Sequence, residues 1–539
     1  MADPFDPREI IRRADRLKAE RATTESHWQE VADYILPARE FQTVNTPGSK
    51  RTAKIFHTGP VMAAEQLAGA RHGFETSPAL RWFAIRPDNP RVMEDVDVKA
   101  WFEDTTDRMY NHLAAPSARF DLNIHEGYLD EAAFGTSVLY IPDRGMRGPG
   151  YQALPLSESY FSEDDEGVID TLIRCYKMRA QDVVGREGWS VPDDMRREAT
   201  DKPDNMWDCV HIMQPDPNNR GGYAEAYILK KTLTMLGRIG RYRDKPFVVS
   251  RWSKRSGEKA GTGPGMNALP DVKMLNKLEE EHLMGVMLAN APPLAVPDDG
   301  FIYTLSQAPR ALNPYRQDEM GFQDRVFPLN TGARPEIAQD KIMGVEARIE
   351  RAFYMQWLSL AQKPNMTATE VLQRRDEMLR LMGPMASRSA TEKLGPLIER
   401  TFGIMWRQGM LRPPPTSMMG MSWRVEYVSP LFKAQQSSDA QSALAYLEAI
   451  ARISAISPQV VDIVDGDEYA RILADRMGAP MQPLRSNAAI DEIRQARAQR
   501  EQATQQAMVA DSITKSLQQG GAGAASLAQA GATRQEMAA

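Results

Sequence analysis

The stretch Leu269–Asn290, LPDVKMLNKLEEEHLMGVMLAN, decides the fold. Its apolar residues recur at the three- and four-residue spacing of one helix face, and lysines and glutamates fill the other positions. At 1.5 Å per residue, a helix over this stretch is roughly 33 Å long. Pro292 and Pro293 end it, because proline cannot continue a helix. The sequence therefore predicts one long amphipathic helix with a sharp stop.

A second helix is predicted at Glu336–Tyr354, beyond a segment rich in proline and glycine that covers residues 292–335. Within that segment, Phe301–Leu305 and Arg325–Leu329 have the composition of short strands. If the two helices are antiparallel neighbours, the segment between them lies at the tip of a helical hairpin.

The part of the chain before the hairpin is predicted to contain helices followed by strands. Asp6 caps a first helix, Pro7 occupies its first position and Glu9 completes a capping box. Its apolar stripe is interrupted at Arg21 and resumes at Trp28. Further helices are expected at Val61–Phe74, Val96–Leu113 and Asn123–Phe134, with a strand at Ser137–Ile141. Four runs rich in Val, Ile, Tyr and Trp predict one small antiparallel sheet: Val168–Met178, Met206–Met213, Tyr223–Leu236 and Phe247–Trp252.

The part after the hairpin is predicted to be mainly helical. Thr367–Gly409 forms a long helical tract that should kink at Gly383–Pro384 and Gly395–Pro396. Further along, the sequence predicts a strand at Ser422–Tyr427, helices at Ser438–Ile453, Pro458–Val464 and Glu468–Met477, and an Ala- and Gln-rich polar helix from Asn487 that fades into a low-complexity tail. The predicted fold class is therefore α+β, mainly helical.

Composition and charge limit the function classes. Hydrophobic residues make up 42% of the 539 residues, so the chain can bury a core. Lys and Arg number 66 against 72 Asp and Glu, and this net charge of −6 argues against coating nucleic acid through net charge. The two cysteines cannot form a disulfide framework, and no run of 18 apolar residues predicts a membrane span.

The residue patterns of common enzymes and cofactor sites are missing from the sequence. The stretch Gly261–Met266, GTGPGM, lacks the third glycine of a dinucleotide loop and is expected to be a flexible loop. No P-loop motif and no metal-ligating histidine pair occurs. The carboxylate runs Glu163–Glu166 and Glu279–Glu281 are expected to be solvated faces. We therefore predict no catalytic residue, no cofactor and no metal.

Four stretches, in the same order along the chain, resemble a known family. The strongest is Asn365–Arg375, NMTATEVLQRR, which continues to Gly383–Pro384 and Leu397–Arg400. The others are Val428–Leu431, residues 263–279, and the stretch from Trp28 to Phe83. Together they resemble the head-to-tail connector, or portal, family of tailed bacteriophages. The motif residues are Thr367, Ala368, Thr369, Glu370, Val371, Gly383, Pro384, Ser429, Pro430 and Leu431.

The resemblance implies an architecture. Portal subunits have a wing, a stem helix pair, a β-containing clip and a helical C-terminal crown, and they form rings, usually of twelve, at one capsid vertex. By this resemblance the wing is 1–268, the first stem helix 269–291, the clip 292–335, the second stem helix 336–357, the tunnel loop with the long kinked wing helix 358–437, the crown 438–486, and the Ala/Gln-rich tail 487–539, which is either a barrel or disordered.

The resemblance also implies partners. These are the major capsid protein, the terminase large subunit, tail adaptor proteins and double-stranded DNA that passes without sequence-specific binding, in a virion assembled in a bacterial cytoplasm. Lys273, Lys277 and Lys363 are candidates to face the DNA channel, although lysines on an outer or intersubunit face fit equally well. Trp357 lies at the position of the family's tunnel loop, where it could contact DNA or pack between subunits.

Two other classes of function stay open as alternatives. A minor head or adaptor protein would be another structural component of the virion. A terminase subunit or nuclease would need a nucleotide loop or an acidic metal cluster, which the sequence lacks. Ring formation separates the portal from the other structural components.

Overall fold

A computed structural model gives the structure of the chain, which divides into two units, Met1–Ser442 and Ala443–Ala539. It describes residues 5–428 apart from 43–47, 90–91, 93–94, 220, 298–305, 307, 316–325, 330–334, 356–381 and 419–421. In the rest of the chain it describes residues 444, 446–453, 466, 469–470, 473, 490 and 492–504. In the second unit, residues 446–453 and 492–504 are helical, and 492–504 is exposed throughout, as a polar helix requires.

Helix α1, Pro7–Tyr34, begins as predicted, with the Asp6 carboxylate accepting a hydrogen bond from the Arg8 amide at 3.0 Å. Glu9 pairs with Arg12 at 2.6 Å. The interruption predicted at Arg21 is wrong, because this side chain is buried with the rest of the stripe. Its guanidinium donates to the Leu156 carbonyl at 2.8 Å and pairs with Glu25, so its charge and donors are satisfied.

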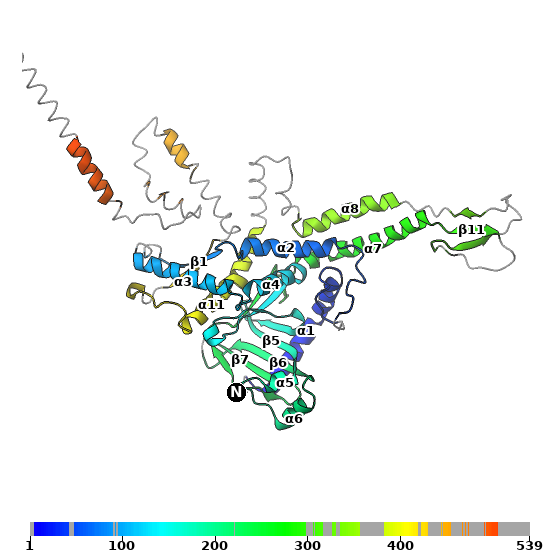
Figure 1. Cartoon of the computed structure of the whole chain (residues 1–539), viewed down its shortest axis with the longest axis horizontal. Helices are drawn as coiled ribbons and strands as arrows, with labels where there is room; N and C mark the ends of the chain where they lie inside the picture. The colour runs from blue at the N-terminus through cyan, green and yellow to red at the C-terminus, as the bar shows by residue number, and fades with distance from the viewer. Residues whose placement is uncertain are drawn as a thin grey trace, which may run out of the picture. The chain divides into compact units, whose positions relative to one another are not determined.

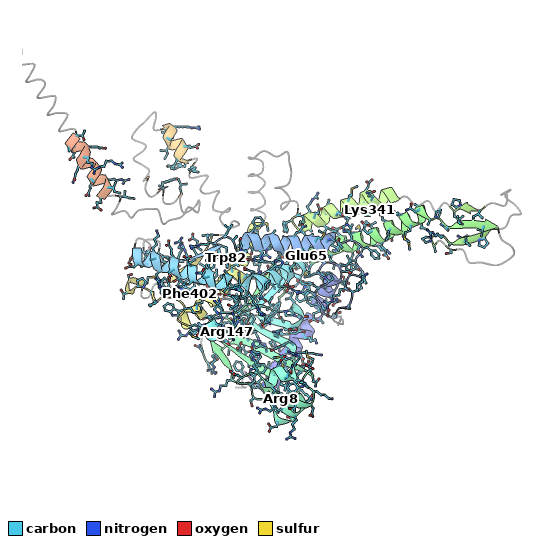
Figure 2. All side chains as sticks on the ribbon, viewed as in Figure 1. Arg8, Glu65, Trp82, Arg147, Lys341 and Phe402 are labelled. Carbon is cyan, nitrogen blue, oxygen red and sulfur yellow. The ribbon has the colours of Figure 1, made fainter. Side chains whose placement is uncertain are left out.

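Three helices and a two-stranded ribbon follow α1. Helices α2, α3 and α4 are Gly59–Glu75, Val96–Ala114 and Phe120–Phe134. Strand β1, Phe83–Pro87, pairs antiparallel with β14, Trp423–Tyr427, which confirms the predicted strand near residue 422. Trp82 and Phe102 are buried in the core that these elements share with the helix at 395–407, and Figure 2 labels Trp82 beside Phe402.

The predicted antiparallel sheet exists, with one strand assigned wrongly. It contains β4 Ser159–Glu163, β5 Ile169–Arg179, β6 Met206–Pro215, β7 Tyr223–Leu229, β8 Thr234–Met235 and β9 Gly240–Tyr242. Helix α1 packs on one face, and α5 Ala180–Val184 and α6 Asp193–Asp201 lie by a separate apolar cluster (Figure 1). Strand β10, Phe247–Arg251, instead pairs with β2, Thr136–Tyr140, whose other neighbour is β3, Gln152–Ala153. All five β10 residues are buried, as expected of a strand that is covered on both faces.

The remaining elements form the hairpin and the region after it. Helix α7 is Pro264–Asn290 and α8 is Pro335–Ala352, with β11 Leu294–Pro297, β12 Leu312–Tyr315 and β13 Phe327–Pro328 between them. A helix over 382–389 passes through a π-helical turn, Ala390–Leu394, into α11, Gly395–Arg407. Short 3₁₀ turns occur at Gly145–Arg147, Leu156–Glu158 and Thr416–Met418.

A buried polar cluster inside the six-stranded sheet makes stability depend on pH. His211 on β6 lies with its Nε2 3.2 Å from Glu225 of β7, and its ring stacks on Tyr227 with 4.0 Å between centroids. The Tyr140 and Tyr242 hydroxyls also donate to Glu225. Burial lowers the pKa of His211. Burial would raise the pKa of Glu225, but its hydrogen-bond donors outweigh that effect and lower it.

We expect the chain to lose stability as the pH falls from 7.5 to 5.5. The unfolded chain protonates His211 near the ordinary pKa of 6.5 and the folded chain does so only at lower pH, so unfolding takes up protons. The loss is at most about 1.4 kcal/mol per pH unit for one histidine, and His72 and His112, whose pKa values burial also lowers, add to it. Urea unfolding at both pH values should show a shallower dependence for His211→Gln. The exposed His27→Gln should match the wild type, and an unchanged slope in His211→Gln would contradict this assignment.

Candidate functional site

The feature that stands out from the body of the first unit is the hairpin of α7 and α8 (Figure 1). The two helices lie side by side, and Arg348 of α8 pairs with Asp271 of α7 at 2.8 Å. A small sheet lies between their far ends, with β11 parallel to β12 and antiparallel to β13. This confirms the hairpin with a β-containing tip that periodicity and proline breaks predict. The strand expected at Phe301–Leu305 lies outside the described residues, and that expected at Arg325–Leu329 is confirmed only for Phe327–Pro328.

The base of α7 is held by contact between two glycine-containing backbones. Gly135, at the end of α4, has a φ of +71°, and a Cβ atom placed on it would lie 2.3 Å from the Gly263 nitrogen. A Cβ on Gly265 would lie 2.7 Å from the Ala133 carbonyl oxygen. The Gly261 amide donates to Thr136 Oγ1 at 2.8 Å. The flexible loop predicted at Gly261–Met266 is therefore wrong in part. Only residues 261–263 are a loop, this loop is closely packed, and Pro264–Met266 already form the first turn of α7.

Along α7, burial changes abruptly from one half to the other. The buried residues are Pro264, Gly265, Ala268, Leu269, Val272 and Leu275, and every residue after Leu275 is partly or fully exposed. The exposed half carries Leu283, Met284 and Met287 at 53%, 54% and 47% exposure. On α8, Met343 is 53% exposed, and Figure 2 labels the neighbouring Lys341. Large apolar side chains gathered on an extended helix pair are typical of an interaction surface.

The candidate channel lysines of α7 both have acidic partners within the chain. Lys273 pairs with Glu30 of α1 at 2.7 Å, and Lys277 pairs with Glu280 at 3.0 Å. Glu280 and Glu281 are partly or fully exposed, as expected of a solvated face. These pairs offset part of the positive charge that the two lysines could present to DNA.

Most other predicted site residues lie outside the described part of the chain. These are Trp357, Lys363, Thr367, Ala368, Thr369, Glu370, Val371, Ser429, Pro430 and Leu431. Gly383 and Pro384 are described and lie in the helix over 382–389, where Gly383 is half-buried and Pro384 exposed. The interruption predicted at Gly395–Pro396 coincides with the π-helical turn that precedes α11. Met382, Met385 and Met405 are buried in the core of this unit.

The π-helical turn carries one of the four residues of a buried ionic cluster. We define this cluster as Arg71 and Glu75 of α2, Glu131 of α4 and Lys393 of the turn. Each of the four is at most 1% exposed. Lys393 Nζ lies 3.0 Å from Glu131 Oε1, Arg71 Nε lies 2.8 Å from Glu75 Oε1, and the other arm of Arg71 reaches Glu131. Two cations and two carboxylates make the cluster neutral.

Neighbouring side chains complete this buried cluster. Ser137 donates to Glu131 at 2.6 Å and Ser389 donates to Glu75 at 2.6 Å. The Tyr128 ring lies 3.6 Å from Lys393 Nζ and 4.7 Å from the Arg71 guanidinium carbon, so both cations contact its face. Burial would raise the pKa of Glu131, but Lys393, Arg71 and the Ser137 hydroxyl outweigh it and lower the pKa to about 2. The cluster ties α2, α4 and the turn together.

A second charge network uses the residue before Lys393. Glu392 accepts hydrogen bonds from Arg251 of β10, at 2.9 Å to Oε1, and pairs with Arg388 at 2.7 Å. Arg251 also pairs with Glu163, which is partly buried there, so the solvated face predicted for Glu163–Glu166 is wrong at this residue. In the π-helical turn, Glu392 thus binds a partner on β10, and the adjacent Lys393 binds one on α4.

Sequence patterns alone do not point to these networks. Arg71 and Glu75 have the four-residue spacing of an exposed helix pair, and nothing in the sequence marks them as fully buried. The networks join α2, α4, β10 and the π-helical turn. Over the described residues, no group of three or more His, Cys, Asp or Glu side chains is placed to bind a metal ion. The described helices also include none that is long and apolar enough to cross a membrane.

The first unit is an α+β body that presents a helical hairpin with a small sheet at its tip. The profile of the bacteriophage head to tail connecting protein family matches residues 7–484, and the chain belongs to that family. It is 30% identical over 534 residues to the probable portal protein of Bordetella phage BPP-1, with 94% of each chain covered. It is 26% identical to the portal protein of Salmonella phage epsilon15, with 92% of each covered. The family is one of structural virion components and not of enzymes.

Solved structures also resemble the chain. A chain in the virion of a native gene transfer agent particle matches with a TM-score of 0.37 at 13% identity, covering 80% of this chain and 94% of that one. A chain in the neck of the native particle, computed with C12 symmetry, matches with a TM-score of 0.36 at 10% identity, covering 77% and 89%.

Proposed function

We propose that this chain forms a closed ring of twelve subunits at one capsid vertex, whose central channel passes double-stranded DNA during packaging and ejection. The observation that carries this proposal is the exposed apolar half of the hairpin. Leu283, Met284 and Met287 stay in water in a lone subunit, and a neighbouring subunit in a ring would bury them. In this assignment α7 from Leu269 onward and α8 are the stem, and the β11–β13 sheet belongs to the clip. Residues 1–268, which include the first turn of α7, belong to the wing.

The acidic charge of the subunit supports a channel that does not hold DNA. Twelve copies at −6 sum to about −72, and a field of that sign keeps a duplex from adhering to the wall. The ring would bind the major capsid protein at the vertex, the terminase large subunit during packaging and tail adaptor proteins afterwards. The subunits would be made in the cytoplasm of the host bacterium.

Electron microscopy of the purified full-length chain tests the ring directly. Negative-stain images should show closed rings with a central hole, and light scattering should give a mass near twelve times 60.4 kDa. Replacing Leu283 and Met287 together by serine should shift the sample toward single subunits, because both side chains are exposed and their loss leaves the core intact. A wild-type sample that stays a single subunit under every assembly condition would contradict the ring, and nucleotide hydrolysis or DNA cleavage by it would contradict the passive role.

The channel lysines are tested by charge reversal. We expect Lys363→Glu to reduce the DNA retained in assembled particles, and Lys273→Glu and Lys277→Glu to have smaller effects because Glu30 and Glu280 already pair with these lysines. Lys231→Glu, on an exposed residue beside Glu198, is the matched control. An unchanged amount of packaged DNA in Lys363→Glu would contradict the assignment of Lys363 to the channel. It would not test the ring itself.

A further inference from the structure

A hollow of about 400 Å³ lies between α1 and strand β6, away from the hairpin. Ile10 and Ile212 line it, but at 3% and 0% exposure they leave a ligand almost no apolar surface to contact. Its walls carry three guanidinium groups, those of Arg12, Arg13 and Arg16. The accessible lining is therefore mainly basic, in a chain whose net charge is negative.

Arg13 is fixed in this hollow by neutral partners. Its Nη1 donates to Gln214 at 3.1 Å, and its Nη2 donates to Ser162 at 3.0 Å and to Thr171 at 3.1 Å. These three bonds hold the guanidinium in place without a direct carboxylate contact. A guanidinium has five N–H donors, so about two remain for another acceptor. Burial lowers the pKa of Arg13, and the nearby Asp170 opposes this effect without offsetting it.

The other two arginines leave positive charge at the rim. Arg12 pairs with Glu9 at 2.6 Å and is mostly exposed. Arg16 is exposed and takes part in none of the ion pairs formed by the described residues, and its charge also contributes to lowering the Arg13 pKa. Three guanidiniums thus face one directly paired carboxylate, Glu9, with Asp170 near Arg13 and Glu20 near Arg16. An anion entering the hollow would meet Arg13 and Arg16 together.

The shape and surroundings of the hollow favour a peptide over nucleic acid. A duplex presents a continuous line of phosphates and needs a matching line of cations. The three arginines instead line one small hollow, in a chain whose net charge is −6. A peptide can place a single carboxylate between two guanidiniums, each of which can bind it through two parallel hydrogen bonds. It can also lay an apolar side chain along the methylene stems of the arginines.

We propose that this hollow binds an acidic segment of a partner protein, in which a carboxylate lies beside an apolar side chain. Arg13 and Arg16 bind the carboxylate, and the methylene stems of Arg12 and Arg16 contact the apolar neighbour. The site lies on α1 and the six-stranded sheet, so this surface adds a protein-docking function to the ring proposed above and does not depend on it.

Fluorescence anisotropy with the full-length chain tests the proposal. The probe is a labelled ten-residue peptide of alternating Glu and Leu, and the control peptide replaces each Glu by Gln. We expect the acidic peptide alone to bind, with an affinity that falls as salt rises. Arg16→Glu should weaken binding about tenfold or more, because it replaces a charge-assisted contact by a repulsive one. Arg16 is exposed, so this variant should fold, which thermal unfolding verifies.

Arg8→Glu is the matched control, since Arg8, which is labelled in Figure 2, is exposed on the same helix and is not among the residues that line the hollow. It should bind the peptide as the wild type does. Equal loss in Arg8→Glu and Arg16→Glu, or no binding of the acidic peptide to the wild type, would overturn the proposal. Displacement of the peptide by a short DNA duplex at lower concentration than by unlabelled peptide would identify a nucleic-acid site instead and overturn it as well.

Discussion

Replacing Lys393 by methionine will lower the free energy of unfolding by about 3–5 kcal/mol, the range measured when one partner of a buried ion pair is removed. The variant leaves Arg71 alone with the two carboxylates of Glu75 and Glu131, so one negative charge stays buried without a partner. Tryptophan fluorescence in urea measures this loss well. All nine tryptophans lie in the first unit, which contains the cluster.

Combining Lys393→Met with Glu131→Gln separates charge balance from packing. The double variant keeps one cation and one carboxylate, so we expect it to be less destabilised than the sum of the two single variants. Lys231→Met makes the same substitution at an exposed lysine and should change stability by less than about 0.5 kcal/mol. Strict additivity of the two cluster substitutions would show that their charges do not interact in the folded chain.

The hairpin could be predicted from the sequence because its signals are local. The apolar spacing in Leu269–Asn290 and the Pro292–Pro293 stop each act within a few residues of the structure that they cause. Even so, α7 begins at Pro264 and not at Leu269. Its true start depends on packing of the glycine loop against Gly135, more than a hundred residues earlier, and no periodicity reports such a contact.

The buried charges could not be predicted, because burial of a charged residue is decided by distant partners. Arg21 interrupts an apolar stripe in the sequence, yet carbonyl oxygens of Leu156 and Ser157 near the start of β4 accept its hydrogen bonds. Lys393 binds Glu131 across more than 260 positions. The pairing of β10 was also mispredicted because its partner is distant in sequence. β10 pairs with β2, more than a hundred residues earlier, and not with the strands that precede it along the chain. A propensity for strands says nothing about which strand is the partner.

Replacing Gly135 by alanine will destabilise the first unit by more than about 4 kcal/mol, a loss seen only where several costs combine. The residue has a φ of +71°, which alanine adopts at a cost, and its new Cβ would lie 2.3 Å from both the Gly263 nitrogen and the Thr262 carbonyl carbon. Both contacts are backbone atoms that cannot rotate away, so α4 and the start of α7 must separate. We therefore expect fewer closed rings in electron micrographs as well as a lower urea midpoint.

Alanine substitutions at two other glycines separate the cost of the positive φ from the cost of the close contact. Gly145 has a φ of +62°, and no atom lies within 4 Å of the position that an alanine Cβ would take there, so Gly145→Ala measures the conformational cost alone, about 1 kcal/mol. Gly69 is exposed inside α2 with open space around it, and Gly69→Ala should stabilise the chain by about 0.5–1 kcal/mol. The difference between Gly135→Ala and Gly145→Ala then measures the close contact that anchors α7. Equal losses of stability in Gly135→Ala and Gly145→Ala would contradict this role of the glycine loop. Glycine would then be required at position 135 only because of its positive φ.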